Sequence, residues 1–261
     1  MARAEIAGLR AGDPHFMAYV GPPSQYDLMS ATQFALLTAM GLRAEHKLLD
    51  VGCGSLRAGR LLIPYLDEGN YFGIEPNEWL VKAGIAENLG SSITKVKKPR
   101  FVHNENFDAS EFQTDFDFVL AQSILSHTGR ELAVTALRAI EPVLAPSGVG
   151  YITFCDRGRF APREDPPAEG WVYPGVVLFR ESEVKAIAAE AGLRATRLSW
   201  YHPRQVWYAL ARSDELLPAR SARRQRGYMA SWPKLESETL KGRLRRQVHD
   251  VKSRLRRGQT G

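Results

Sequence analysis

The sequence predicts an α/β fold: a doubly wound sheet of mostly parallel strands, with a basic helical tail. Short apolar strands alternate with segments of helical spacing along most of the 261 residues. Near residue 200 two strands follow each other without a helix between them, which predicts an antiparallel pair at one edge of the sheet. A glycine-rich turn at residues 48–59 directly follows the first strand, where such sheets bind ligands.

Each element is expected from its own local pattern. A helix at 27–40 has apolar residues at helical spacing and precedes the first strand. The strand at 116–121 is nearly all apolar, as expected for a strand buried on both faces. The other expected strands are 47–51, 71–74, a weak one at 101–104, 149–154, 194–200 and 205–212. The other expected helices are 58–66, 78–88, 130–144, closed by the Pro-Ser-Gly at 146–148, and 181–191.

The composition indicates a soluble globular protein. Hydrophobic residues make up 44% and charged residues 25% of the chain, and no apolar run is long enough for a transmembrane helix. The first residues contain no apolar core of signal-peptide length. Two cysteines are too few for a disulfide framework, so we expect a reduced, cytoplasmic protein.

The charge divides the chain into two regions. The formal net charge is +6, but residues 218–261 alone carry 13 Lys and Arg against three Asp and Glu. The body at 1–217 is therefore mildly acidic, and the basic character belongs to the tail. We expect one domain at 1–217 and a separate basic, amphipathic helical tail at 218–261.

The turn LLDVGCGSLRAG (48–59) fits neither of two common nucleotide-binding motifs. Gly52 and Gly54 match the start of a dinucleotide fingerprint, but Arg57 occupies the third glycine position. A P-loop would need Lys and a hydroxyl residue after Gly59, where Arg and Leu stand. An acid that ends the second strand, Glu75, lies about 20 residues further on and suits the hydroxyls of a ribose.

With these residues the chain resembles the class I S-adenosylmethionine-dependent methyltransferases. The resemblance rests on LLDVGCGSLRAGRLLIPYL followed by YFGIEPNEWL, on FDFVLAQSILSH and EPVLAPSGVGYITF, and on the final strand pair. It covers about residues 27–212. It implies a seven-stranded sheet in the order 3-2-1-4-5-7-6 with strand 7 antiparallel, and S-adenosylmethionine as the methyl donor.

The resemblance also implies roles for individual residues. The turn of Asp50, Gly52, Cys53 and Gly54 would hold the methionine end of the cofactor, with Cys53 more a filler than a nucleophile. Glu75 would bind the ribose hydroxyls, and Gln122 would line the cofactor with its backbone. Asp108 is placed to bind the adenine amino group, for which Asn104 and Asn106 compete. Plain structural roles stay open: a strand-to-helix turn at the glycines, a neighbour of a helix N-cap at Glu75 and a cap at Asp108.

Two histidines are candidates for the general base that an alcohol acceptor would need. His127 follows the fourth strand at the open, carboxyl-terminal edge of the sheet, and is the first candidate. His202, with Arg204, lies in the turn between the last two strands at the same edge. Asp156 ends the fifth strand there and is a weaker candidate. Each of these side chains also has an ordinary structural interpretation, such as packing at a helix end.

Two segments are expected to cover the site. One is the N-terminal stretch before the first helix, and the other is a proline-rich, aromatic insertion at 157–180. Trp171 and Tyr173 could stack on a ring or a sugar, or simply anchor the insertion to the body.

The favoured function is O-methylation of a small molecule or a saccharide. The region after the fourth strand lacks the Asp/Asn-Pro-Pro-Tyr typical of base N-methylation, and no metal-binding motif is present. Two alternatives stay open: a nucleic-acid or ribosome-associated methyltransferase that uses the basic tail, and a cofactor-binding protein without catalysis.

Within the tail, apolar residues recur every three or four positions, which predicts one apolar helix face surrounded by Lys and Arg. These residues are Leu240, Leu244, Val248, Val251 and Leu255. Such a helix can dock on the body or on a second subunit, giving a possible homodimer. It can also lie on the anionic inner face of a membrane or, less favourably, bind nucleic acid.

Overall fold

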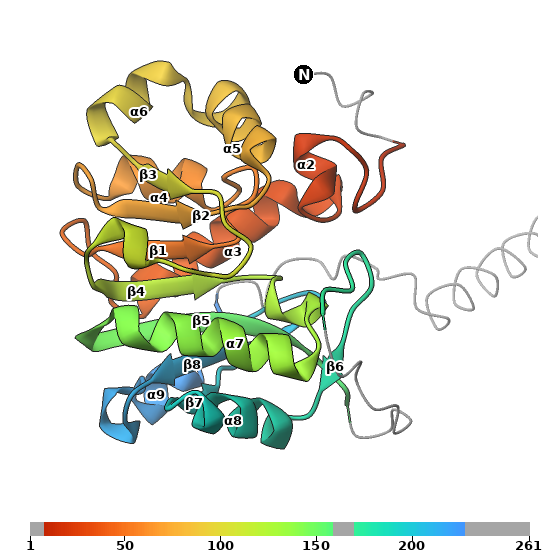
Figure 1. Cartoon of the computed structure of the whole chain (residues 1–261), viewed down its shortest axis with the longest axis vertical. Helices are drawn as coiled ribbons and strands as arrows, with labels where there is room; N and C mark the ends of the chain where they lie inside the picture. Colours follow the sequence, from red (N-terminus) through yellow and green to blue (C-terminus); the bar gives the residue numbers. More distant parts are fainter. Residues whose placement is uncertain (1–7, 159–169, 228–261) are drawn as a thin grey trace, which may run out of the picture. The chain divides into compact units, whose positions relative to one another are not determined.

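The computed structural model describes residues 8–158 and 170–227, which belong to one compact unit. Its strands are, in chain order, β1 (Leu48–Val51), β2 (Tyr71–Ile74), β3 (Arg100–Val102), β4 (Phe116–Ala121), β5 (Leu144–Asp156), β6 (Leu178–Phe179), β7 (Arg194–Arg197) and β8 (Val206–Ala211). Its helices are α2 (Phe16–Tyr19), α3 (Tyr26–Ala39), α4 (Gly59–Tyr65), α5 (Glu78–Gly84), α6 (Ser91–Lys97), α7 (Arg130–Ile140), α8 (Glu181–Glu190) and α9 (Arg220–Arg223). Figure 1 labels these elements.

The predicted sheet order is confirmed. The strands lie in the order β3-β2-β1-β4-β5-β8-β7. β8 runs antiparallel to both of its neighbours, whereas β1 to β5 pair in parallel. β7 and β8 are the predicted sixth and seventh strands, because the two-residue strand β6 pairs beside β5 off the main path. The sequence does not predict β6, since two residues give no periodicity.

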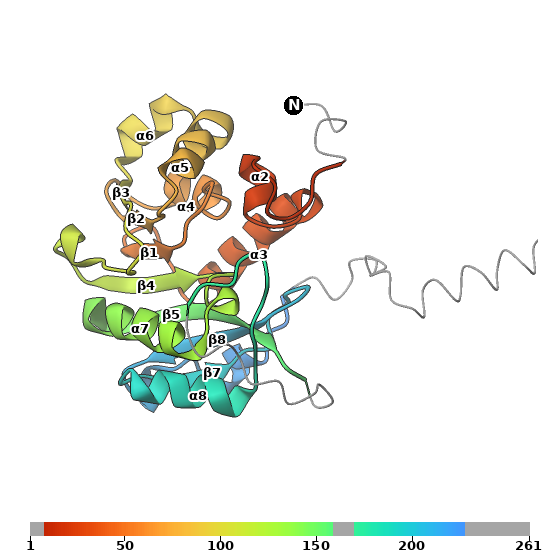
Figure 2. The same cartoon turned by 45° about the vertical axis from the view of Figure 1, so that its right-hand side comes forward.

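Helices cover both faces of the sheet. On one face, α7 and α8 lie side by side, with α8 beside β7, as Figures 1 and 2 show, and they share one core cluster with alternate residues of β1, β2, β4, β5 and β8. On the other face, α3, α4 and α5 pack on the remaining residues of these strands and on β8. This arrangement leaves the carboxyl-terminal ends of the parallel strands free to form a site.

The connection from α7 to β5 differs from the expectation. The predicted helix 130–144 ends as an α-helix at Ile140, and a short 3₁₀ turn, Glu141–Val143, follows. Pro142 lacks a backbone N–H, so it cannot continue the α-helical hydrogen bonds. β5 then begins at Leu144, earlier than predicted, and the Pro-Ser-Gly at 146–148 forms an irregularity in the pairing with β4 rather than a helix end.

Beyond Leu217 the chain still contacts the sheet. The guanidinium group of Arg223 donates to the hydroxyl of Thr196 in β7 at 3.1 Å and to the carbonyl of Pro218. The domain boundary predicted after residue 217 stays a prediction, and the predicted tail helix lies outside the described residues. No helix in the described ranges combines the length and apolarity needed to cross a membrane.

Candidate active site

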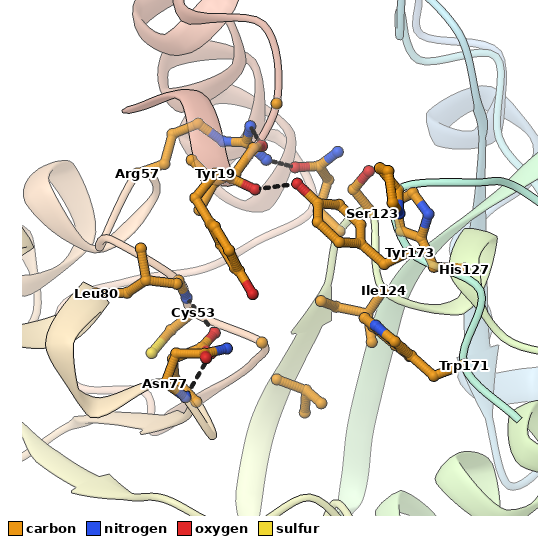
Figure 3. Close-up of a pocket in the computed structure, with 18 of the residues that line it drawn as sticks. Tyr19, Cys53, Arg57, Asn77, Leu80, Ser123, Ile124, His127, Trp171 and Tyr173 are labelled. Atoms are coloured by element: carbon orange, nitrogen blue, oxygen red, sulfur yellow. Dashed lines mark hydrogen bonds between the residues drawn. The ribbon is translucent and has the colours of Figure 1, made fainter. Parts of the chain in front are cut away.

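A cavity of about 920 Å³ lies at the carboxyl-terminal ends of β1, β2, β4 and β5. The residues that directly follow these strands form its base, and Figure 3 shows part of its lining. Of the residues predicted from the sequence, the cavity brings together Asp50, Gly52, Cys53, Gly54, Glu75, Gln122, His127, Asp156, Trp171, Tyr173 and Arg204. Asp108 and His202 are not among its lining residues.

The turn after β1 requires both of its glycines. Gly52 and Gly54 have φ angles of +68° and +54°, which residues with a Cβ rarely adopt. A Cβ on Gly52 would lie 2.1 Å from Cδ1 of Ile124, and one on Gly54 would lie 2.6 Å from Cγ1 of Val20. The turn is therefore a cradle in which neighbouring groups press directly on the backbone.

Glu75 ties this turn to the end of β2. One oxygen of its buried carboxylate accepts the backbone N–H of Gly54 at 3.0 Å. The other accepts both the backbone N–H and the side-chain amide of Asn77, each at 2.9 Å. A carboxylate has about four acceptor positions, so Glu75 keeps room for about one more donor, and for a second if Asn77 turns its amide away.

Asp50 is buried beneath the turn. The hydroxyl of Tyr71 in β2 donates to its carboxylate at 2.7 Å. Burial raises the pKa of Asp50 to about 7, although the bond from Tyr71 acts in the opposite direction. The sequence does not indicate this role for Tyr71, because a tyrosine in an apolar strand resembles an ordinary core residue.

Cys53 lies on the cavity wall with little of its side chain exposed. Its Sγ packs 2.8 Å from the position that a Cβ on Gly73 would occupy. Burial raises the pKa of its thiol well above the ordinary value, which keeps the thiol protonated and unreactive. These observations support the interpretation of Cys53 as filler in the turn.

Arg57 connects the glycine turn to the end of β4. Its buried guanidinium donates to the carbonyl of Val20 at 2.6 Å and to the side-chain oxygen of Gln122, which also accepts from Gln33. Burial lowers the pKa of Arg57 to about 10, so it stays charged at neutral pH. In the sequence, Arg57 only argues against a dinucleotide motif, although its position in the glycine turn is a signal for a role in the site.

His202 supports this network from outside the cavity. Its Nδ1 accepts the backbone N–H groups of Arg204 and Gln205 at 3.1 and 2.9 Å. Its Nε2 lies 3.0 Å from the side-chain nitrogen of Gln122. Burial, reinforced by two nearby arginines, lowers the pKa of His202 to about 3. Because Nδ1 accepts two backbone N–H groups, Nε2 carries the proton of the neutral ring and has no free lone pair, so His202 is suited to hold its turn rather than to accept a substrate proton.

His127 lines the cavity, in the 3₁₀ turn that follows β4. Its Nδ1 lies 2.5 Å from the carbonyl oxygen of Gly175, and a carbonyl can only accept, so Nδ1 carries the proton. Nε2 is then the nitrogen with the free lone pair in the neutral ring. Burial lowers the pKa of His127, an effect larger than the opposing one of the Gly175 carbonyl.

The loop after β3 reaches the cavity with residues other than Asp108. The lining residues here are Asn104, Glu105 and Phe107. The carboxylate of Asp108 instead accepts the backbone N–H of Ser110 at 2.8 Å, as a cap on the following turn. Asn104, which the sequence offered as a competing partner for adenine, is held in place by its hydrogen bonds to the backbone of Asp108.

Two covering segments meet across the cavity mouth. The first runs through α2 and contributes Tyr19 to Pro22. The second contains Trp171 and Tyr173, from the described part of the predicted insertion. The hydroxyl of Tyr173 donates to the backbone carbonyl of Tyr19, as Figure 3 shows. The ring of Tyr173 packs 5.0 Å from His127, so this contact closes the cavity beside the candidate base.

Comparison with known proteins indicates the kind of enzyme to which this cavity belongs. Residues 49–149, from β1 into β5, match the family model described as "Methyltransferase domain". This match, together with the sheet order, supports assignment to the class I S-adenosylmethionine-dependent methyltransferases. The chain is an enzyme, and its cofactor is S-adenosylmethionine. No curated protein matches the sequence.

Solved structures share the fold of this methyltransferase at low sequence identity. Magnesium protoporphyrin IX methyltransferase from Synechocystis PCC 6803 with bound S-adenosylhomocysteine is 13% identical, with a TM-score of 0.53 over 73% of this chain and 84% of that one. The sugar N-methyltransferase KedS8 from Streptoalloteichus sp is 18% identical, with a TM-score of 0.53 over 72% and 89%. Mitomycin 7-O-methyltransferase MmcR is 17% identical, with a TM-score of 0.54 over 74% of this chain and 55% of that one.

The residues of the methyltransferase fit its cofactor. Gly52 and Gly54 line the cavity without side chains of their own, and a buried carboxylate, Glu75, lies beside them with acceptor capacity left. Within residues 8–158 and 170–227, no group of three or more His, Cys, Asp or Glu side chains forms a candidate metal site.

Proposed function

We propose that this methyltransferase methylates a hydroxyl group of a small acceptor, with His127 as the general base. The observation that carries the proposal is the bond from Nδ1–H of His127 to the carbonyl of Gly175, on the wall of the cavity that contains the glycine turn. This bond fixes the neutral tautomer and leaves Nε2 free to take a proton.

Some residues of the cavity would bind the cofactor, and others would act on the acceptor. The turn of Gly52 to Gly54 and the Glu75 carboxylate would hold the cofactor, with Glu75 accepting from its ribose hydroxyls. S-adenosylmethionine supplies the methyl carbon, and its sulfur keeps the electron pair of the broken carbon–sulfur bond. Nε2 of His127 takes the hydroxyl proton of the acceptor while the acceptor oxygen forms its bond to carbon. The covering segments exclude water from this step.

The covering segments favour a small acceptor over a nucleic acid. A polynucleotide needs an open, basic face, whereas Tyr19 and Tyr173 meet across the cavity mouth. Mitomycin and a sugar are the acceptors named for two enzymes of the same fold, and molecules of that size suit a cavity of about 920 Å³.

The proposal predicts that His127→Ala lowers kcat by about 10² to 10⁴-fold while the affinity for S-adenosylhomocysteine changes little. S-adenosylhomocysteine release is measured over a panel of hydroxylated small molecules, and affinity is measured by calorimetry. His46→Ala is the matched control, because His46 precedes β1 at the opposite end of the sheet. The control should keep both properties.

The pH profile gives a second measurement. The base must be neutral, and the pKa of His127 lies below its ordinary value. The acidic limb of kcat/KM should therefore fall below about pH 6.5, the reference pKa of histidine. Full kcat in His127→Ala would overturn the role of His127, and the same kinetic test would then be applied to His202→Ala.

A further inference from the structure

Arg204 places a positive charge on the side of the cavity that also contains His127 and Asp156, which is the acceptor side under the proposed function. It lies in the turn before β8, is exposed to solvent, and lines the cavity. Its guanidinium has five N–H donors. In the described residues one nitrogen donates to the side-chain oxygen of Gln25, and no carboxylate forms a salt bridge with it.

A second cation stands beside it. A Cβ built on Gly21 would lie 3.3 Å from Nη1 of Arg57 and 4.0 Å from Nη2 of Arg204, so the two guanidinium groups border the same glycine. Burial is the main cause of the lowered pKa of Arg57 and of His127, and the charge of Arg204 acts in the same direction on both. Two like charges held this close are relieved when an anion binds between or beside them.

The acids that line the cavity leave this charge uncompensated. Asp50 and Glu75 lie at the donor end and are bonded to Tyr71, Gly54 and Asn77. Glu105 belongs to the loop after β3, in the same donor half.

On the acceptor side the lining acid is Asp156. It pairs with Arg197 at 3.3 Å and accepts the backbone N–H of Gly158. The described acceptor half therefore has a positive field with apolar and aromatic walls, including Ile124, Trp171 and Val176.

Building on the proposed function, we infer that the acceptor carries an oxyanion, a carboxylate or a phosphate, that Arg204 binds while the acceptor hydroxyl faces His127. The guanidinium fork suits both anions. The apolar walls contact the carbon skeleton between the hydroxyl and the acid. Arg57, whose contacts fix the glycine turn, adds its charge without needing to move.

The test uses matched pairs of probes with the full-length protein saturated with S-adenosylhomocysteine. The carboxylate pairs are 4-hydroxybenzoate with its methyl ester and glucuronate with glucose, and the phosphate pair is glucose 6-phosphate with glucose. Calorimetry measures binding, and release of S-adenosylhomocysteine from S-adenosylmethionine measures transfer. We expect at least one anionic probe to bind about tenfold or more tightly than its neutral partner, as charge-assisted hydrogen bonds allow. The successful pair distinguishes carboxylate from phosphate.

Arg204→Gln should remove this preference while S-adenosylhomocysteine still binds. Arg138→Gln makes the same charge change on α7, where Arg138 contacts Glu190 at 3.4 Å, and should keep the preference. The inference is wrong if anionic and neutral probes bind equally, if no anionic probe binds while S-adenosylhomocysteine does, or if the preference survives in Arg204→Gln. Arg204-dependent binding of the anion without methylation of any hydroxyl probe would instead contradict the proposed function.

Discussion

Two glycines with similar backbone angles differ in what surrounds them. Gly52 has φ +68° and a Cβ there would collide with Ile124, whereas Gly69 has φ +78° and open space around it. An alanine at either position has the same backbone strain, about 1–2 kcal/mol. At Gly52 alone the added Cβ would also displace Ile124 from its contact with the turn.

Gly52→Ala should therefore lose measurable affinity for S-adenosylhomocysteine, whereas Gly69→Ala should retain it. Both variants should be less stable to urea than the wild type, with Gly52→Ala the less stable because Ile124 must move. Calorimetry and urea unfolding measure the two effects separately. Normal affinity in Gly52→Ala would show that the cofactor does not press on this turn.

The sequence allowed part of the site to be predicted at this scale. Asp50, the two glycines and Glu75 belong to a local motif, and the structure brings them to one cavity. Arg57 and Tyr71 were not assigned roles, because their importance depends on partners distant in sequence, such as Gln122 and Asp50. Nor does the sequence show that Nδ1 of His202 accepts two backbone N–H groups.

The two covering segments act as elements joined at one point. The hydroxyl of Tyr173 donates to the carbonyl of Tyr19, whose ring also packs 5.4 Å from that of Trp79 on α5. Cofactor exchange through this side requires the segments to separate. The strength of their contact should therefore influence the rate of release.

Tyr173→Phe should speed release of S-adenosylhomocysteine several-fold, because a net hydrogen bond contributes about 0.5–1.5 kcal/mol. Stopped-flow displacement measures the rate. Tyr65→Phe is the control, since the hydroxyl of Tyr65 also donates to a backbone carbonyl, that of Leu42, away from the cavity. Equal release rates in both variants and the wild type would mean that this contact does not limit exchange.

At the scale of the whole molecule, we predict that the cavity functions without the tail. The lining residues in the described part of the chain run from Ala11 to Gln205. Because Arg223 bonds to β7, the informative truncation removes residues 228–261 rather than everything after 217. The sequence predicts that this region is a basic, amphipathic helix suited to an anionic surface.

Truncation after Gly227 should leave the affinity for S-adenosylhomocysteine within about twofold, well below the tenfold change that 1.4 kcal/mol produces. The full chain should float weakly with anionic vesicles at low salt, and the truncated chain should not. If neither protein floats with the vesicles, the tail does not attach the protein to membranes. Loss of cofactor affinity on truncation would show that the tail supports the site.

The sheet order was predictable because class I methyltransferases share it, whereas the boundaries of β5 were not. Strand and helix periodicity identified β1, β2 and β4 almost to the residue. The Pro-Ser-Gly at 146–148 is a common signal for a helix end, yet here it lies inside a long strand. Tertiary pairing with β4 overrides this local preference, and no local pattern reports such pairing.

The position of β8 between β5 and β7 has a consequence for how the protein is made. A ribosome completes β7 before β8, yet β7 pairs with the sheet only through β8. Until β8 emerges, β7 has no partner strand, and β5 has an open edge that could join another chain. Arg204 and His202 belong to the same late segment. The nascent methyltransferase therefore completes its sheet and its proposed acceptor pocket together, when this segment emerges.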